Sequence, residues 1–412
     1  MRTFWTSNQY SLFRFFFGCY LITHFGYLLP WAAEIFSNQG MISNSMASPI
    51  FGVIPNLLQL NDSPIFVNLM ITSALFSAVL FTIGVKDKLA AIWMLYVLIC
   101  LFARNPLIAN PALPYVGWML LAHLFIPSKP HADWSMGKDK EIPQQWHMPQ
   151  CVYYAAVVIL ALSYSYSGYT KLLSPSWVSG EAISYVLENP LARHYWLPDF
   201  LMWLPPLFLK LLTWFILYVE LLYAPLALIR GTHKWLWLSM LVVQFGFLFL
   251  LSFPDLTFAM ILFHLFTFNP NWLKPKPAIE PETVYYDGEC GICHGYIKLL
   301  LAEDKQNHFY FAPLQGQSFI NNISSTEREG LPISMLVRTD CNQLLTKSDA
   351  VIHCLIRLGG LWRVIGMVLS LFPRFLRNYL YDCFARIRQF ILPKPEGICP
   401  ILSPELAKRF LG

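Results

Sequence analysis

The chain has 412 residues, of which 56% are hydrophobic and only 13% are charged. Soluble domains carry about 25% charged residues, so the composition excludes an ordinary soluble protein. The net charge of +5 arises without any basic run of the kind that binds nucleic acid. It fits the excess of Lys and Arg in the inward-facing loops of membrane proteins.

The apolar residues gather in the first two thirds of the chain. Residues 10–270 contain long runs with few charges, whereas residues 271–412 have the mixed composition of a soluble domain. We therefore predict a mainly α-helical, polytopic membrane domain at residues 1–272. A linker at residues 273–282 leads to a small α/β domain at residues 283–412.

Eight stretches are apolar enough to be predicted as membrane-spanning helices. They are residues 9–32, 64–84, 88–104, 107–127, 150–172, 206–229, 235–252 and 255–270. Lys or Arg follows every even-numbered span, at positions 86, 88, 129, 138, 140, 230, 234, 274 and 276. Because positive residues favour the cytoplasmic side, we expect a multi-pass protein of a bacterial-type inner membrane with both termini cytoplasmic. We expect no cleavable signal, because the first apolar run continues past residue 30 without a cleavage site.

Two charged residues fall inside predicted spans, where charges are costly and therefore informative. Arg14 lies in the first span and Glu220 in the sixth, at depths that an arginine side chain can bridge, so we predict an ion pair between them. The alternative is that Arg14 reaches the headgroups and Glu220 is protonated. His24, His123 and His264 are expected to be hydrogen-bonded packing residues.

The segment 164–187 at the outer end of the fifth span combines several unusual features. Ser167-Gly168 permits another helix to approach closely, and Trp177 opens an outer loop that can re-enter the membrane. Lys171 closes the span, and a partly desolvated lysine can lose its proton and act as a base. An ordinary interfacial lysine is the alternative.

The stretch "VYYDGECGICHGY" at 284–296 contains the one closely spaced cysteine pair, Cys290 and Cys293. A strand is predicted up to Tyr286, a turn at Asp287-Gly288, and a helix at 291–303. This context favours a redox pair. The helix N-terminus stabilises a thiolate at Cys290, and Cys293 would then resolve the mixed disulfide.

Other interpretations of the cysteine pair fit less well. A nearby carboxylate such as that of Asp287 raises a thiol pKa, although shaping the turn is its expected role. The motif also spells Cys-x-x-Cys-His, as in c-type haem attachment sites. Such attachment generally belongs to the outer side of bacterial membranes, whereas this motif is predicted to lie on the cytoplasmic side. A zinc site would need a second ligand pair, and the other seven cysteines are scattered. We therefore expect no metal.

The remainder of the C-terminal domain completes a thioredoxin-like pattern. Strands are predicted at 308–314 and 332–338, and the turn 339–343 joins the latter to a further strand and a helix. Pro332 precedes the third strand, where such folds often place a cis proline that faces the disulfide.

The segment 358–373 is apolar but too short to span a bilayer, so a packed or interfacial helix is expected. The following segment, 374–390, sets arginines among aromatic residues. It could lie on an anionic inner leaflet, or it could be a solvated basic helix face.

The C-terminal third resembles the DCC-type thiol-disulfide oxidoreductases. The resemblance is carried by "YYDGECGIC" (285–293), "KSDAVIHCLIRLGG" (347–360), "RNYLYDCFARIR" (377–388) and the terminal "CPILSPELAKRFL". It implies a redox pair at Cys290 and Cys293 and leaves the substrate open.

The N-terminal part is similar to the HTTM-type membrane domain shared with vitamin K-dependent gamma-carboxylases. The similarity is carried by "SLFRFFFG" (11–18), "SGYTKL…W…G" (167–180) and "GTHKWLWLSMLVVQFGFLFLLSF" (231–253). It implies that Lys171 occupies the place of the base that deprotonates the quinol. The large extramembrane region that grips the carboxylase substrate is missing from this chain.

The sequence is compatible with three functions. The first is a membrane-bound thiol–disulfide oxidoreductase with a cytoplasmic cysteine pair, a thiol or disulfide partner that is a protein or a small molecule, and a membrane domain that faces a quinone or lipid. The second is a carboxylase-like enzyme with Lys171 as base. The third is a non-catalytic membrane scaffold. A quinone is the candidate cofactor, and the lipid bilayer is an expected partner.

Overall fold

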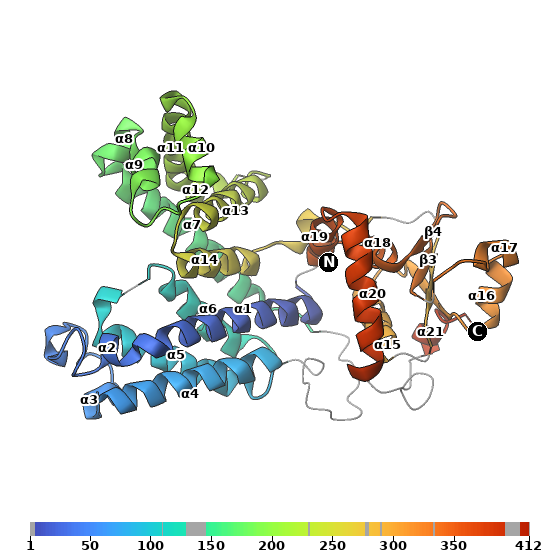
Figure 1. The fold of residues 1–412 in the computed structure, drawn as a ribbon, viewed down its shortest axis with the longest axis horizontal. Coiled ribbons are helices and arrows are strands. Elements are labelled where there is room, and N and C mark those ends of the chain that lie inside the picture. The colour runs from blue at the N-terminus through green and yellow to red at the C-terminus, as the bar shows by residue number, and fades with distance from the viewer. Residues whose placement is uncertain are drawn as a thin grey trace. The chain divides into compact units, whose positions relative to one another are not determined.

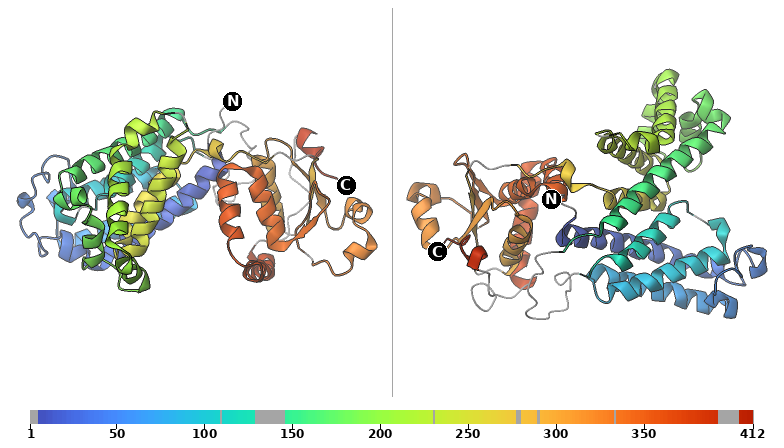
Figure 2. Two further views of the ribbon diagram at one scale, coloured as in Figure 1. Left: turned by 90° about the horizontal axis from the view of Figure 1, so that it is seen from above. Right: turned by 180° about the vertical axis from the view of Figure 1, so that it is seen from behind.

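The computed structural model describes residues 5–108, 110–128, 146–229, 231–276, 280–288, 291–332, 334–391 and 404–411, without the side chains of 291–294, 387–391 and 404–405. The chain forms two compact units. One is helical, Tyr10–Phe268, and the other joins the residues up to Gln9 with Asn269–Gly412. Figures 1 and 2 show the elements of each unit.

The helical unit consists of long apolar helices joined by short ones. The helices are α1 (Ser7–Leu28), α2 (Ala32–Phe36), α3 (Leu57–Leu60), α4 (Pro64–Ile83), α5 (Asp87–Arg104), α6 (Leu113–Phe125), α7 (Gln150–Leu172), α8 (Pro175–Ser179), α9 (Ala182–Glu188), α10 (Trp196–Trp203), α11 (Pro206–Leu221), α12 (Tyr223–Ala227), α13 (His233–Leu250) and α14 (Pro254–Phe266).

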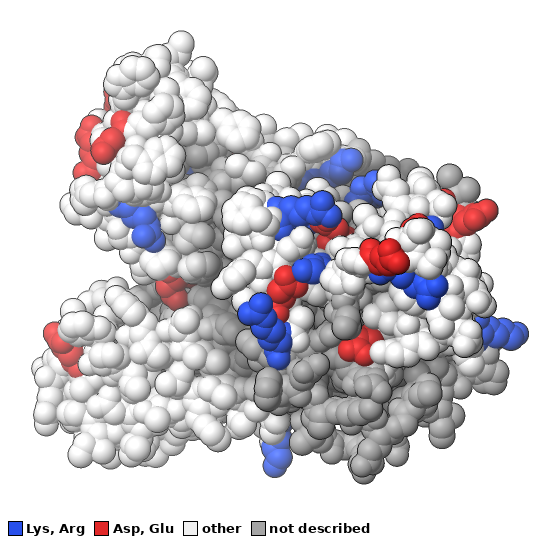
Figure 3. All heavy atoms as spheres, turned by 45° about the vertical axis from the view of Figure 1, so that its right-hand side comes forward, with Lys and Arg blue, Asp and Glu red and all other residues white. Residues whose placement is uncertain are grey.

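Four stretches among the described residues are long and apolar enough to cross a membrane, namely Ser7–Phe36, Pro64–Ile83, Gln150–Leu172 and His233–Leu250. A fifth is obtained if α10 and α11, which are bent by 107° at their junction, form one span. Large apolar side chains on these helices are exposed, and Figure 3 shows a broad uncharged surface over the helical unit. Exposed apolar surface of this extent indicates apolar surroundings, so the helices indicate a multi-pass membrane protein.

Some predicted helix boundaries shift for reasons of backbone chemistry. The predicted span 107–127 begins as a helix only at Leu113, because Pro106–Ile108 form a 3-10 turn. The predicted span 206–229 breaks after Leu221. Pro225 lies four residues further on, and a proline ring clashes with the carbonyl four residues before it.

The C-terminal unit is built on a mixed four-stranded sheet. Its elements are β1 (Glu282–Tyr286), α15 (Gly291–Glu303), β2 (Phe309–Pro313), α16 (Gln317–Asn322), α17 (Ser325–Arg328), β3 (Leu336–Arg338), β4 (Leu344–Thr346), α18 (Lys347–Leu358), α19 (Gly360–Ser370), α20 (Arg374–Ile391) and α21 (Pro404–Ala407). The strand order is β2-β1-β3-β4; β1 is parallel to β2, and β3 is antiparallel to β1 and β4. The predicted order of strand, helix, strand, hairpin and helix is confirmed.

The third strand differs from the prediction at its start. It begins at Leu336 rather than at Pro332. Proline cannot donate a ladder hydrogen bond, and Ser334 N donates to Pro332 O at 2.8 Å, which closes a tight turn instead. The expected cis proline is wrong, because the Leu331–Pro332 bond is trans, as most X-Pro bonds are.

A buried carboxylate fastens residues that precede the helical unit to residues that follow it, within the C-terminal unit. Glu303, the last residue of α15, accepts hydrogen bonds from Thr6 Oγ1, Asn8 Nδ2 and Trp362 Nε1, each at 2.8 Å. Each donor therefore satisfies part of a carboxylate that is only 8% exposed. Residues 5–9 thus belong to the fold of this unit although the helical unit, Tyr10–Phe268, separates them from the rest of it in sequence.

Candidate functional site

The redox motif lies where β1 gives way to α15. The strand ends at Tyr286, and the helix begins at Gly291. Cys290 lies outside the described residues, and of Cys293 only the backbone is described, in the first turn of α15. Cys290 directly precedes this helix in sequence, and a helix N-terminus carries free N–H groups and partial positive charge that favour a thiolate.

The turn that follows β1 is held by one glutamine. Gln315 Nε2 donates to Asp287 Oδ1 at 3.2 Å, and Gly288 N donates to Gln315 Oε1 at 3.3 Å. An added Cβ at Gly288 would lie 3.3 Å from that oxygen and 3.4 Å from Pro313 Cβ. Asp287 therefore takes part in fixing the turn against the end of β2.

The segment before β3 reaches the same end of the sheet. Tyr285 pairs with Leu336 in the antiparallel register, so the residues before β3 and those after β1 share one edge. The hydroxyl of Tyr381 on α20 accepts a hydrogen bond from Met335 N at 3.0 Å and fixes this segment. Pro332 lies at its start, in the loop that leads to β3.

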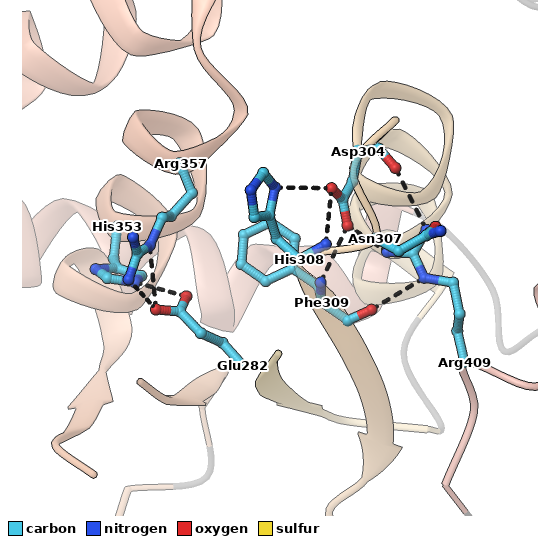
Figure 4. A network of polar contacts seen from close by, with 8 residues as sticks. All are labelled: Glu282, Asp304, Asn307, His308, Phe309, His353, Arg357 and Arg409. Carbon is cyan, nitrogen blue, oxygen red and sulfur yellow. Dashed lines mark hydrogen bonds and ion pairs between the residues drawn. The ribbon is translucent and has the colours of Figure 1, made fainter. Parts of the chain in front are cut away.

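The opposite end of β1 carries a buried network of charges that the sequence analysis missed (Figure 4). Glu282, which is 1% exposed, contacts His353 Nε2 at 2.7 Å and Arg357 Nη2 at 2.5 Å. Arg357 also contacts Asp340 at 2.8 Å. Burial raises the pKa of Glu282, but the hydrogen bonds and charges of His353 and Arg357 outweigh it and hold that pKa below its usual value. The spacing of His353 and Arg357, four residues apart on one helix face, was the available signal.

A second buried network fixes the end of the chain (Figure 4). Asp304 accepts hydrogen bonds from His308 N and Phe309 N, both at 3.0 Å, and forms an ion pair with Arg409. Arg409 Nε donates to Phe309 O at 3.0 Å, and Phe410 forms a parallel bridge with Phe311. The terminal motif therefore binds the free edge of β2, which gives the "AKRFL" letters a structural role.

Two described cysteines of this unit are poor nucleophiles. Cys354 on α18 is fully buried, and burial raises the pKa of its thiol. Cys341 is exposed in the turn between β3 and β4, where the hydrogen bond and charge of Asp340 raise its pKa. Within the described part of the chain, no group of three His, Cys, Asp or Glu residues could hold a metal.

The helical unit contains a second cluster around Lys171, at the end of α7. Lys171 Nζ lies 2.8 Å from Ser167 Oγ, 2.5 Å from Glu220 Oε2 and 5.0 Å from the centroid of the Trp177 ring. The side chain of Glu220 is 5% exposed. An added Cβ at Gly168 would lie 2.2 Å from Leu221 N, so the close approach of α7 and α11 brings the two charges together.

The predicted ion pair between Arg14 and Glu220 is wrong. Arg14 Nη1 contacts Asp87 Oδ2 at 2.9 Å, whereas Glu220 contacts Lys171. Asp87 is the first residue of α5, where an acidic side chain also meets the positive end of the helix. Glu220 therefore has Lys171 as its partner in place of the arginine that the sequence suggested.

The three histidines that were predicted to be packing residues, His24, His123 and His264, are buried and hydrogen-bonded. Their partners are the Asp255 carboxylate for His24 at 3.0 Å, the Tyr10 hydroxyl for His123 at 2.7 Å, and Met260 O for His264 at 2.9 Å.

The C-terminal unit combines a mixed sheet with a Cys-x-x-Cys sequence motif at a strand-to-helix junction. Residues 284–394 match the family described as DCC1-like thiol-disulfide oxidoreductase. The C-terminal part of the chain therefore carries a DCC1-like domain.

Two curated relatives are similar to about a third of the chain. The uncharacterized protein YuxK of Bacillus subtilis is 28% identical over 136 residues, which are 32% of this chain and 96% of that protein. A chloroplastic DCC family protein of Arabidopsis thaliana is 24% identical over 131 residues, which are 31% of this chain and 76% of that protein. No solved structure matches the chain.

Proposed function

We propose that this protein is a membrane-bound thiol–disulfide oxidoreductase whose catalytic pair is Cys290 and Cys293. The observation that carries the proposal is the position of the motif, between β1 and α15 of a DCC1-like domain. The sheet order β2-β1-β3-β4, with β3 antiparallel to its neighbours, supports a thioredoxin-like fold for this domain.

The reaction is a two-electron exchange. The Cys290 thiolate attacks one sulfur of a partner disulfide, forms a mixed disulfide and releases the other partner sulfur as a thiolate, which takes a proton from water. The Cys293 thiolate then attacks Cys290, so that the second partner thiol leaves and the protein carries the disulfide. The partner is reduced by two electrons and the cysteine pair is oxidised; the reverse sequence oxidises a partner dithiol.

The membrane part of the proposal has eight spans, α1, α4, α5, α6, α7, α11, α13 and α14, with both termini in the cytoplasm of a bacterial-type cell. The positive residues after even-numbered spans support it. A further support is Gly360 of α19, because an added Cβ there would lie 3.1 Å from Gln9 Nε2 and 3.3 Å from Pro270 Cβ. Two flanking segments that are held together on one side of a membrane fit an even number of crossings, such as the proposed eight.

A second candidate activity rests on the contact between Lys171 and Glu220. An HTTM-like membrane domain with a quinone ligand would use Lys171 as a base. The Lys171 amino group is held by the carboxylate of Glu220 and the hydroxyl of Ser167 and lies against the Trp177 ring, where it would meet such a ligand. The membrane domain would then act on the quinone or a lipid, while the cysteine pair exchanges electrons with its own partner.

Thiol trapping on the full chain in membranes tests the leading proposal. We expect a reversible couple of roughly −120 to −270 mV. It should be lost in Cys290→Ser and Cys293→Ser and unchanged in Cys341→Ser, the matched control. Cys293→Ser should also accumulate mixed disulfides through Cys290. Thiols that never oxidise would overturn the proposal. If the function of the protein is lost in Lys171→Gln but retained in Cys290→Ser, the mechanism with Lys171 as base is favoured. If neither substitution affects function, a non-catalytic scaffold is favoured.

A further inference from the structure

Two consecutive helices of the C-terminal unit expose an apolar surface, which we call the α19–α20 face. Leu371, in the turn between the helices, is 82% exposed and Phe375 is 77% exposed. The other exposed apolar members of the face are Met367, Val368, Leu369, Phe372, Tyr379, Leu380 and Phe384. Isolated exposed apolar residues are normal, but a contiguous set marks an interaction surface.

The other side of α20 shows that this exposure is built into the fold. Arg377 contacts Asp349 at 3.0 Å, and Asp382 accepts from Lys347 Nζ at 2.8 Å. Ser348 Oγ donates to Asn378 Oδ1 at 2.6 Å. The helix is therefore held to its own domain by polar contacts and turns its aromatic residues outward, which reverses the usual orientation of an amphipathic surface helix.

The start of α19 lies beside both connections to the membrane-spanning region. Gly360 N donates to Leu273 O at 2.6 Å, and an added Cβ at Gly360 would approach both Gln9 and Pro270. Gln9 is part of α1. Pro270 follows the last residue of α14, Phe266, by four positions and lies within about 14 Å of it in any conformation. Helix α19, whose later residues belong to the face, therefore begins next to both chain connections to the helical unit.

We propose that the α19–α20 face docks into the interfacial layer of the lipid bilayer in which the helical unit is embedded. Aromatic side chains suit that layer, and basic residues beside them suit anionic headgroups. Arg386, which is exposed, supplies positive charge at the face, whereas Arg374 Nε contacts Asp349 at 2.7 Å on the side that holds α20 to its own domain. The one acidic residue of the two helices, Asp382, is engaged by Lys347. A bilayer fits this combination of charge and aromatic surface without any additional protein.

Photo-crosslinking tests the occupant of the face directly. In the full chain, p-benzoyl-phenylalanine replaces Phe375 or Tyr379, and in the control it replaces Thr326, which is exposed on α17. After irradiation in native membranes, we expect lipid adducts at 375 and 379 in at least about fivefold higher yield than at 326. Equal yields at all three positions would overturn the proposal.

The same experiment separates the other possible occupants. A crosslink to the helical unit of the same chain, identified by mass spectrometry, or a crosslinked dimer would each overturn bilayer docking. In nanodiscs, adding about 30% phosphatidylglycerol to phosphatidylcholine should raise the lipid adduct at 375, and Arg386→Glu should remove that increase while leaving the yield in phosphatidylcholine unchanged. An increase that persists in Arg386→Glu would exclude the arginine as the basis of lipid preference.

Discussion

The charge network at the start of β1 permits a quantitative prediction. In Glu282→Gln, the amide keeps the shape of the side chain but loses the negative charge that Arg357 and His353 share. Hydrogen bonds to charged groups contribute about 1.5–3 kcal/mol each, and breaking a buried pair costs about 3–5 kcal/mol. Arg357 retains Asp340 as a partner, so we expect the free energy of unfolding of the C-terminal unit to fall by about 2–3 kcal/mol.

Pulse proteolysis in urea measures this loss on the full chain in detergent micelles, with the C-terminal unit followed through a C-terminal tag. With a slope of about 2 kcal/mol per molar urea, the midpoint should fall by about 1 M. Glu327→Gln is the matched control, because Glu327 is exposed in its ion pair with Arg338. Such exposed pairs contribute at most about 1 kcal/mol. Equal midpoints for the two variants would refute the assigned role of Glu282.

The pH dependence of this difference has a definite sign. The folded state lowers the pKa of Glu282 below its value in the unfolded chain. The stabilisation is therefore present above the unfolded pKa and is lost as the pH falls through the folded pKa. The difference in midpoint between wild type and Glu282→Gln should be largest near neutral pH and should shrink progressively once the pH falls below about 4.5.

Two further predictions concern the packing of the helical unit and the reactivity of a thiol. Gly168→Ala should lower the thermal stability of the detergent-solubilised protein, because the added Cβ would lie 2.2 Å from Leu221 N. The control Gly246→Ala should leave it unchanged, because no atom lies within 4 Å of the Cβ added there. Equal melting temperatures for the two variants would contradict the close approach of α7 and α11. Cys341 should react more slowly with iodoacetamide at pH 7 than an unperturbed exposed thiol, because the Asp340 carboxylate raises the pKa of the Cys341 thiol. Asp340→Asn should therefore accelerate the reaction, as measured by mass spectrometry. A rate that Asp340→Asn does not change would exclude Asp340 as the cause.

Local signals in the sequence predicted local structure well. The strand at Tyr286, the turn at Gly288 and the helix that follows were visible because apolar period and turn residues are properties of neighbouring positions. The α7 residues Ser167 and Gly168 likewise predicted a close helix approach, and Gly168 is in close contact with Leu221.

Pairings between distant residues could not be predicted in the same way. Arg14 and Asp87 are 73 positions apart, and no periodicity states which helices are neighbours. Glu220 was predicted as the partner of Arg14 because the sequence indicates only how deep each residue lies in the membrane, and not which helices are neighbours. The same limit explains why the partners of Glu282, which lie 71 and 75 positions away, were missed.

The Glu303 contacts have a consequence for the order in which the protein is assembled. Thr6 and Asn8 leave the ribosome before the helical unit does, and their acceptor is synthesised 295 to 297 positions later. At about 5–20 residues per second, the amino-terminal segment waits roughly 15–60 s for its partner. During that interval the helices between them can insert into the membrane. The C-terminal unit is therefore completed only after the whole helical unit has been synthesised.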